Sequence, residues 1–135
     1  ILDDAFGVVL ESDNRPYNLG GWRDGNEVSW KLNIPQAGMY EILIEYARPG
    51  QEPMAWGIIK LDHAGGETRE LKFKARPTGK HGNDWSVCKI NDGCGAYLES
   101  GPLQLSIRPD FGDDYTGTEY FINLRGVALR LQKDE

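Results

Sequence analysis

Apolar and polar residues alternate along the segment Glu27–Pro35, where the apolar positions are Val28, Trp30, Leu32 and Ile34. A period of two is typical of a β-strand that buries one face. Gln36-Ala37-Gly38 then favours a turn, and a second stripe follows at Tyr40, Ile42, Ile44 and Tyr46. Together the two stripes predict an antiparallel hairpin over Glu27–Tyr46, with Trp30, Ile42 and Ile44 buried on one face.

Shorter alternating segments cover much of the remaining chain. They are Trp56–Asp62, Glu70–Ala75, Trp85–Ile90, Leu103–Arg108 and Tyr120–Leu131. A turn at 63–66 separates the first two, and Asn91-Asp92-Gly93 follows the third. In the last segment the alternation shifts by one near Arg125-Gly126, as a β-bulge would shift it. With roughly seven or eight short strands and no helical period, the chain is predicted to form an all-β, single-domain antiparallel β-sandwich over residues 1–135.

Length and charge limit the classes of function. A chain of 135 residues suits one domain. Its 21 Asp and Glu against 15 Lys and Arg give a net charge of −6, which argues against nucleic-acid binding because that needs a basic face. The apolar runs, such as Ala55–Ile59, are too short for a membrane span. Because the sequence begins abruptly at Ile1, we expect it to be a piece of a longer protein.

Motifs for catalysis are missing from the sequence. The two histidines, His63 and His81, do not form a metal-binding pair, and there is no nucleophile elbow or phosphate loop. A glycosidase needs two carboxylates across a cleft, and nothing in the sequence selects such a pair. The acidic stretch Asp110–Tyr115 lacks the spacing of a calcium loop and is interpreted as a polar loop between strands. We therefore expect no enzyme activity and no cofactor.

Several segments, in this order, resemble one known group of proteins. They are Asn18-Leu19-Gly20-Gly21-Trp22, Glu27-Val28-Ser29-Trp30, Pro35-Gln36-Ala37-Gly38-Met39-Tyr40, Tyr46-Ala47, Pro77-Thr78-Gly79 leading to Trp85, and Tyr120–Val127. The chain resembles non-catalytic carbohydrate-binding modules of families six and thirty-five, and most of all the domains appended to bacterial α-L-fucosidases and sulfatases. The resemblance implies a jelly-roll-like sandwich. It also implies a polysaccharide or oligosaccharide ligand, a covalently linked catalytic domain and a secreted, periplasmic or cell-surface location.

The same resemblance suggests a structural calcium site. In families six and thirty-five, acidic residues of the first strand and an Asp of the last strand often hold the ion. Asp3 and Asp4 match the first position, but Asn123 stands where the second Asp is expected. Because a neutral amide is a weaker calcium ligand than a carboxylate, we expect chelation to change stability little.

Cys88 and Cys94 bracket the turn at Asp92-Gly93. In an exported protein, this pair is expected to form a disulfide. The alternative is two thiols, one buried and one exposed. Redox catalysis is not expected, because the spacing is not C-x-x-C.

Sugars stack their C–H faces on flat aromatic rings and hydrogen-bond to planar polar groups around them. Trp85 lies in a loop with such neighbours: Lys80, His81, Asn83 and Asp84. We predict that Trp85 is the stacking platform and that Asp114, Tyr115 and Glu119 of the last loop contribute. The positive charges of Arg23, Arg76, Lys80 and His81 would suit a sulfated or uronic sugar.

Trp22 and Trp56 are further candidates for sugar contact. Trp22, beside Arg23, is either a ligand-binding residue or a plug at one end of the sandwich. Trp56 has the opposite parity to Ile59 and Leu61, so it faces outward if those two point inward. For all three tryptophans, including Trp85, the alternative is a partly buried packing residue.

The sequence thus predicts a carbohydrate-binding module that targets an attached polysaccharide-degrading enzyme to its glycan. The alternative is a structural accessory sandwich that packs on a catalytic domain and binds no sugar; such a domain should expose an apolar patch.

Overall fold

The computed structural model describes the backbone of residues 2–3, 9–11, 18–20, 22–23, 26–48, 55–63, 65–79, 88–90, 94–111 and 121–132. Its regular structure consists of β-strands. None of these described ranges contains a helix that is long and apolar enough to cross a membrane.

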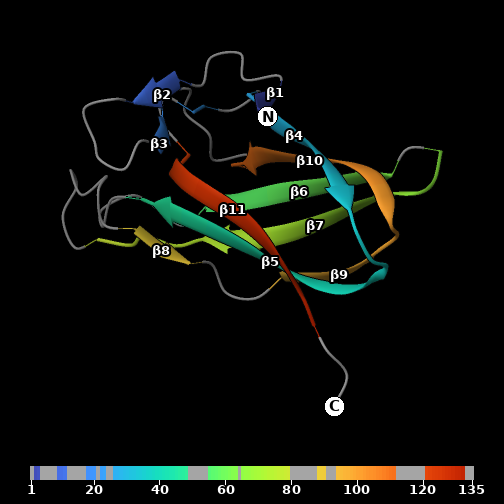
Figure 1. The fold of residues 1–135 in the computed structure, drawn as a ribbon. Coiled ribbons are helices and arrows are strands. Elements are labelled where there is room, and N and C mark those ends of the chain that lie inside the picture. Colours follow the sequence, from blue (N-terminus) through green and yellow to red (C-terminus); the bar gives the residue numbers. More distant parts are fainter. Residues whose placement is uncertain are drawn as a thin grey trace.

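The strands form two antiparallel sheets (Figure 1). The first has five strands, in the order β1 (Leu2–Asp3), β4 (Val28–Ile34), β10 (Gly101–Asp110), β6 (Ala55–His63) and β7 (Thr68–Ala75). The second has six, in the order β2 (Val9–Glu11), β3 (Asn18–Gly20), β11 (Asn123–Leu131) and β5 (Gly38–Ala47), with β8 (Cys88–Ile90) and β9 (Cys94–Leu98) both paired to β5. The predicted all-β sandwich is confirmed.

The predicted hairpin over Glu27–Tyr46 is wrong. β4 pairs with β1 and β10 in the five-stranded sheet, whereas β5 pairs with β11, β8 and β9 in the six-stranded sheet. The turn at 35–37 therefore carries the chain from one sheet to the other. The alternation identified the buried face of each strand correctly, because two strands facing each other across a sandwich show the same period as two paired strands.

Other predictions about local structure are confirmed. β6 and β7 form an antiparallel hairpin whose turn uses Gly65 at a φ of 73°, a backbone conformation that glycine adopts without strain. The register of β11 against β5 shifts between Leu124 and Gly126, so the predicted bulge is present. The strands β1, β2, β3 and β9 were not predicted, because β1–β3 are very short and β9 follows a turn-rich sequence.

The core lies between the sheets and contains side chains of both. Fully buried positions include Val28, Ile42, Ile44, Ile59, Leu61, Leu98, Leu105 and Ile107. Tyr40 and Tyr46 are also buried, as their parity predicted, while Trp30 packs against the core and stays partly exposed. Trp30 is therefore less buried than predicted, although it is paired with Leu2 of β1.

Candidate functional site

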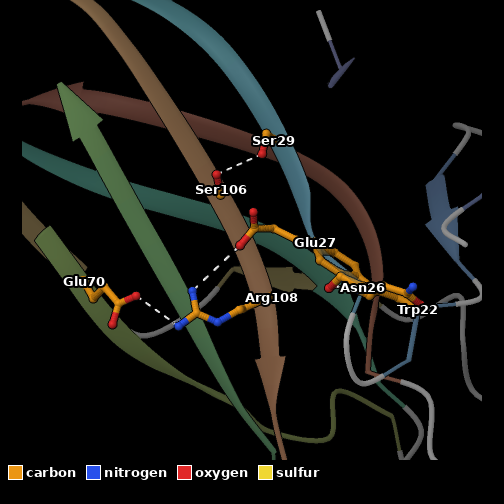
Figure 2. Close-up of polar contacts among 7 residues, drawn as sticks. All are labelled: Trp22, Asn26, Glu27, Ser29, Glu70, Ser106 and Arg108. Atoms are coloured by element: carbon orange, nitrogen blue, oxygen red, sulfur yellow. Dashed lines mark hydrogen bonds and ion pairs between the residues drawn. The ribbon is translucent and has the colours of Figure 1, made fainter. Parts of the chain in front are cut away.

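Trp22 lies inside the core and cannot stack on a ligand. Its side chain has no exposed surface, and its ring meets the ring of Phe121 edge-on with centroids 5.2 Å apart. The indole Nε1 donates to the carbonyl of Asn26 at 2.9 Å; Figure 2 shows both residues. The fully buried side chain leaves no face of Trp22 on which a sugar could stack, which favours its alternative as a packing residue. No apolar periodicity around Trp22 distinguishes the two roles in the sequence.

Arg23, the next residue, is exposed. Its backbone N–H donates to the side-chain oxygen of Asn26 at 3.1 Å, and its carbonyl accepts from the Asn26 N–H at 3.1 Å. These two bonds fix the turn, so Arg23 is presented at the surface directly beside the buried Trp22.

Trp56 lies on the outer side of the five-stranded sheet. Ile59 and Leu61 are fully buried and Trp56 is half-buried, so the prediction that Trp56 faces away from the core is confirmed. The register places it between Asp110 and Lys74. The ammonium of Lys74 lies 5.3 Å from the centroid of the Trp56 ring, within range of a cation–π interaction.

Charged side chains continue from Trp56 along the same face. Arg108 lies between two carboxylates, with Nη2 at 3.0 Å from Glu70 Oε2 and Nη1 at 3.8 Å from Glu27 Oε2 (Figure 2). Lys72 pairs with Asp110 at 3.4 Å. These side chains keep about a third or more of their surface exposed to water, so the ion pairs add little stability. Asp110 and Lys74 flank Trp56, and Arg108 and Lys72 flank the half-buried Ile58. An aromatic ring beside carboxylate and guanidinium groups is suited to sugar recognition.

The predicted residues of the two binding loops lie outside the described residues. They are Lys80, His81, Asn83, Asp84, Trp85, Asp114, Tyr115 and Glu119. What the structure describes is Gly79, just before the first loop, and Phe121, just after the second. Both are bonded to Arg48. Sequence reasoning missed Arg48; the available signal was a cation directly after the apolar stripe of β5.

Of the three proposed calcium ligands, Asn123 is the one whose side chain the structure describes. Asn123 is buried and opposes Ala47 in the six-stranded sheet, whereas the backbone of Asp3 pairs with Ser29 in the other sheet. Arg48 follows Ala47 and brings a buried guanidinium to the carbonyl of Phe121. Among the described residues, no three His, Cys, Asp or Glu gather as metal ligands; Asp4 lies outside these residues.

The predicted disulfide between Cys88 and Cys94 is wrong. Cys88 opposes Ala47 and Cys94 opposes Ile42, both along β5. Because a strand advances about 3.4 Å per residue, their Cα atoms lie roughly 17 Å apart, whereas a disulfide allows at most about 7 Å. Cys94 is a free thiol whose Sγ lies 3.5 Å from the carbonyl oxygen of Lys72. Burial raises the pKa of the Cys94 thiol.

The described surface has a second distinctive area on the six-stranded sheet. Met39 and Tyr97 oppose each other on β5 and β9 and are 45% and 44% exposed, the most of any large apolar side chains described. With Gln36, Leu131 and Gln132 they line a hollow of about 510 Å³. This area lies on the other sheet from Trp56.

The fold is that of the carbohydrate-binding β-sandwich modules. A family 35 carbohydrate-binding module from Clostridium thermocellum matches with a TM-score of 0.70 and 16% identity, over 96% of this chain and 89% of that chain. A β-1,3-glucan-binding CBM6 from Bacillus halodurans matches with a TM-score of 0.67 and 15% identity, over 96% of this chain and 95% of that one.

A similar sandwich also occurs within a larger enzyme. The GH26-CBM35 β-(1,4)-mannanase from Podospora anserina matches with a TM-score of 0.63 and 14% identity, over 100% of this chain but 28% of the mannanase. No protein-family model and no curated protein matches the chain. At these identities, the likeness establishes the fold of the chain.

Proposed function

We propose that this protein is a non-catalytic carbohydrate-binding module, spanning residues 1–135, that holds a linked polysaccharide-degrading enzyme at its glycan. The observation that carries the proposal is the fold, two antiparallel sheets that match the β-sandwich of carbohydrate-binding modules over almost the whole chain. The structural neighbours support it, since they include separate modules and a module within a mannanase. A linked catalytic domain and a secreted, periplasmic or cell-surface location belong to the same proposal.

Two surfaces of the proposed module are suited to a sugar. The first is the loop end, where Trp85 is the proposed stacking platform, with Asn83, Asp84, Asp114 and Glu119 as hydroxyl partners. The second is the outer face of the five-stranded sheet around Trp56. We favour the loop end, because loops can enclose a ligand on several sides whereas a sheet face contacts only one. Affinity for a short glycan should be modest, about 10 μM to 1 mM, because a shallow site makes few contacts.

Affinity electrophoresis in gels that contain a neutral or an acidic polysaccharide tests this function. We expect Trp85→Ala to abolish retardation of the protein and Trp56→Ala to retain it, because a weak site cannot lose its stacking surface and still bind. Tyr97→Ala is the matched control, since it removes an exposed aromatic ring from the other sheet. Near-ultraviolet circular dichroism checks that each variant is folded.

The outcomes of this experiment separate the hypotheses. Loss of binding with Trp56→Ala alone would place the site on the sheet face. Binding that both tryptophan variants keep would contradict both surfaces, and a parent protein that no polysaccharide retards would contradict the function itself. If binding is confined to sulfated or uronic polymers and weakens with salt, the positive charges of Arg23 and Arg76 become the next residues to replace.

The second candidate function is a structural accessory domain. The exposed pair of Met39 and Tyr97, beside Leu131, is the apolar patch on which a catalytic domain could pack. Two large side chains are few for such an interface, because interface cores gather several aromatic and aliphatic anchors. For this reason we rank this function second; a module that binds no glycan but gains stability when its linked domain is present would reverse the order.

A further inference from the structure

Lys74 differs from the other cations beside Trp56 in having no carboxylate partner. Arg108 lies between two carboxylates, and Lys72 Nζ lies 3.4 Å from Asp110 Oδ2. Lys74 is exposed, and no carboxylate of the described residues forms an ion pair with it. Its ammonium instead lies over the indole of Trp56, 5.3 Å from the ring centroid. The charge of Lys74 is therefore available to an anionic ligand that also contacts this ring.

Trp56 and Lys74 lie at one end of the five-stranded sheet. Trp56 is the second residue of β6, and its register partner Lys74 is the penultimate residue of β7. Because β6 lies between β7 and β10 (Figure 1), the ion pair of Lys72 with Asp110 passes over β6 beside Trp56. A ligand on the Trp56 ring cannot extend along the sheet without crossing this ion pair, which favours contact with a single sugar unit.

This arrangement is complementary to a sugar unit that carries a negative charge. The C–H face of a pyranose packs on an indole ring, and a carboxylate or sulfate on the same unit would pair with Lys74. Asp110, the register partner of Trp56 on β10, would repel that group and direct it to the β7 side of the ring. A neutral sugar lacks this pairing and competes with the ammonium for the ring, because the ammonium is itself attracted to the indole.

We propose that Trp56 and Lys74 form a subsite for one anionic sugar unit, a uronate or a sulfate ester, in which Trp56 is the stacking surface and Lys74 holds the anion. We call this pair the anion subsite. The inference rests on the proposed function and names the class of sugar for this face, without any contribution from the two loops. Contact with one sugar unit is too weak to retard the protein in a gel, so a main site at the loop end is compatible with it.

Titrations followed by ¹H–¹⁵N NMR test the subsite with three methyl glycosides that differ at C6. They are methyl glucoside, methyl glucuronide and methyl glucoside 6-sulfate, and the last two distinguish the two kinds of anion. At about 0.1 M salt we expect both anionic ligands to shift the signals of Trp56 and Lys74, with Kd values about threefold to tenfold below that of the glucoside. The preference should disappear at about 1 M salt.

Four variants test the two proposed contacts. Lys74→Gln should equalise the three affinities, and Lys74→Arg should keep the preference within about twofold because it keeps the charge. Trp56→Leu should weaken binding of all three ligands. Asp110→Asn should tighten binding of the anionic ligands about threefold, because it removes a repulsive charge and releases Lys72.

Arg69→Gln is the matched control for Lys74→Gln. It removes one exposed cation from the same strand, five residues and about 17 Å away, which exceeds the Debye length at this salt concentration. We expect Arg69→Gln to keep the preference of the parent. If Arg69→Gln lowers it as much as Lys74→Gln does, net charge causes the preference and the subsite is overturned.

The remaining outcomes distinguish failure of the subsite from failure of the proposed function. Equal affinities in the parent, or a preference that Lys74→Gln keeps, overturn the anion subsite even if a polysaccharide retards the parent. Inorganic sulfate that binds as tightly as the 6-sulfate also overturns it, because the Trp56 ring then contributes nothing. A parent that no polysaccharide retards contradicts the proposed function, while shifts at Trp56 and Lys74 that depend on the anion and on the ring still support the subsite.

Discussion

Gly57 offers the sharpest test of how the sandwich packs around Phe73 and Phe121. It lies on β6 opposite Phe73 of β7, on the inner face of the sheet. A Cβ at this position would lie 2.1 Å from Cε1 and 2.4 Å from Cζ of Phe73, and 2.9 Å from Cζ of Phe121. Carbon atoms in contact prefer about 3.5–4.0 Å, so Gly57→Ala forces the Phe73 ring to move by more than an ångström.

The ring of Phe73 has little room to move. It packs against Tyr46 and Phe121, with centroids 6.3 and 6.1 Å away, and Phe121 in turn meets the ring of Trp22. Overpacking of this kind costs about 1–3 kcal/mol, and the lower backbone entropy of alanine in the unfolded state returns roughly 0.5–1 kcal/mol. We therefore expect a net loss of about 1–2 kcal/mol, or on the order of 3–8 °C in melting temperature.

Urea unfolding followed by tryptophan fluorescence measures this loss as a lower midpoint with an unchanged slope. Gly126→Ala is the control, because nothing lies within 4 Å of a Cβ there; without a clash, it should leave stability unchanged or raise it by up to about 1 kcal/mol. Adding Phe73→Leu should recover much of the loss, giving a coupling energy of roughly 1 kcal/mol in a double-mutant cycle. Equal stability of Gly57→Ala and Gly126→Ala would refute the packing argument.

Two further predictions concern the cysteine and the metal. Cys94 is a free thiol whose pKa is raised by burial, so less of it is thiolate at a given pH. Iodoacetamide should therefore label Cys94 more slowly than a cysteine in a peptide. The protonated thiol of Cys94 contributes to folding stability, and this contribution should be lost as the pH rises above the ordinary thiol pKa. A reducing agent should leave the melting temperature unchanged. A marked drop in the melting temperature would instead support the predicted disulfide between Cys88 and Cys94. Chelation with EDTA should also leave the melting temperature unchanged, because an ion bound only to the folded state would raise it; a calcium-dependent increase would show that Asp3, Asp4 and Asn123 form a site.

The sequence by itself determined which face of each long strand is buried. The period of two placed Ile42 and Ile44 inside and put Trp56 on the face opposite to Ile59 and Leu61, and a shift in that period located the bulge in β11. These properties are local, because successive side chains of a strand point to opposite faces whatever the strand pairs with. The class of fold followed from the same pattern.

Pairing and the candidate site were decided only by the tertiary structure. Alternation does not distinguish a paired neighbour from a strand across the core, so β4 and β5 looked like a hairpin although they belong to different sheets. Register along β5 separates Cys88 from Cys94 despite their closeness in sequence. Trp22 and Arg48 lie outside any periodic stripe, and both are buried and bonded to Phe121, which is distant in the sequence. Such contacts depend on which distant segments of the chain meet in the folded structure, and no local pattern of residues determines which segments meet.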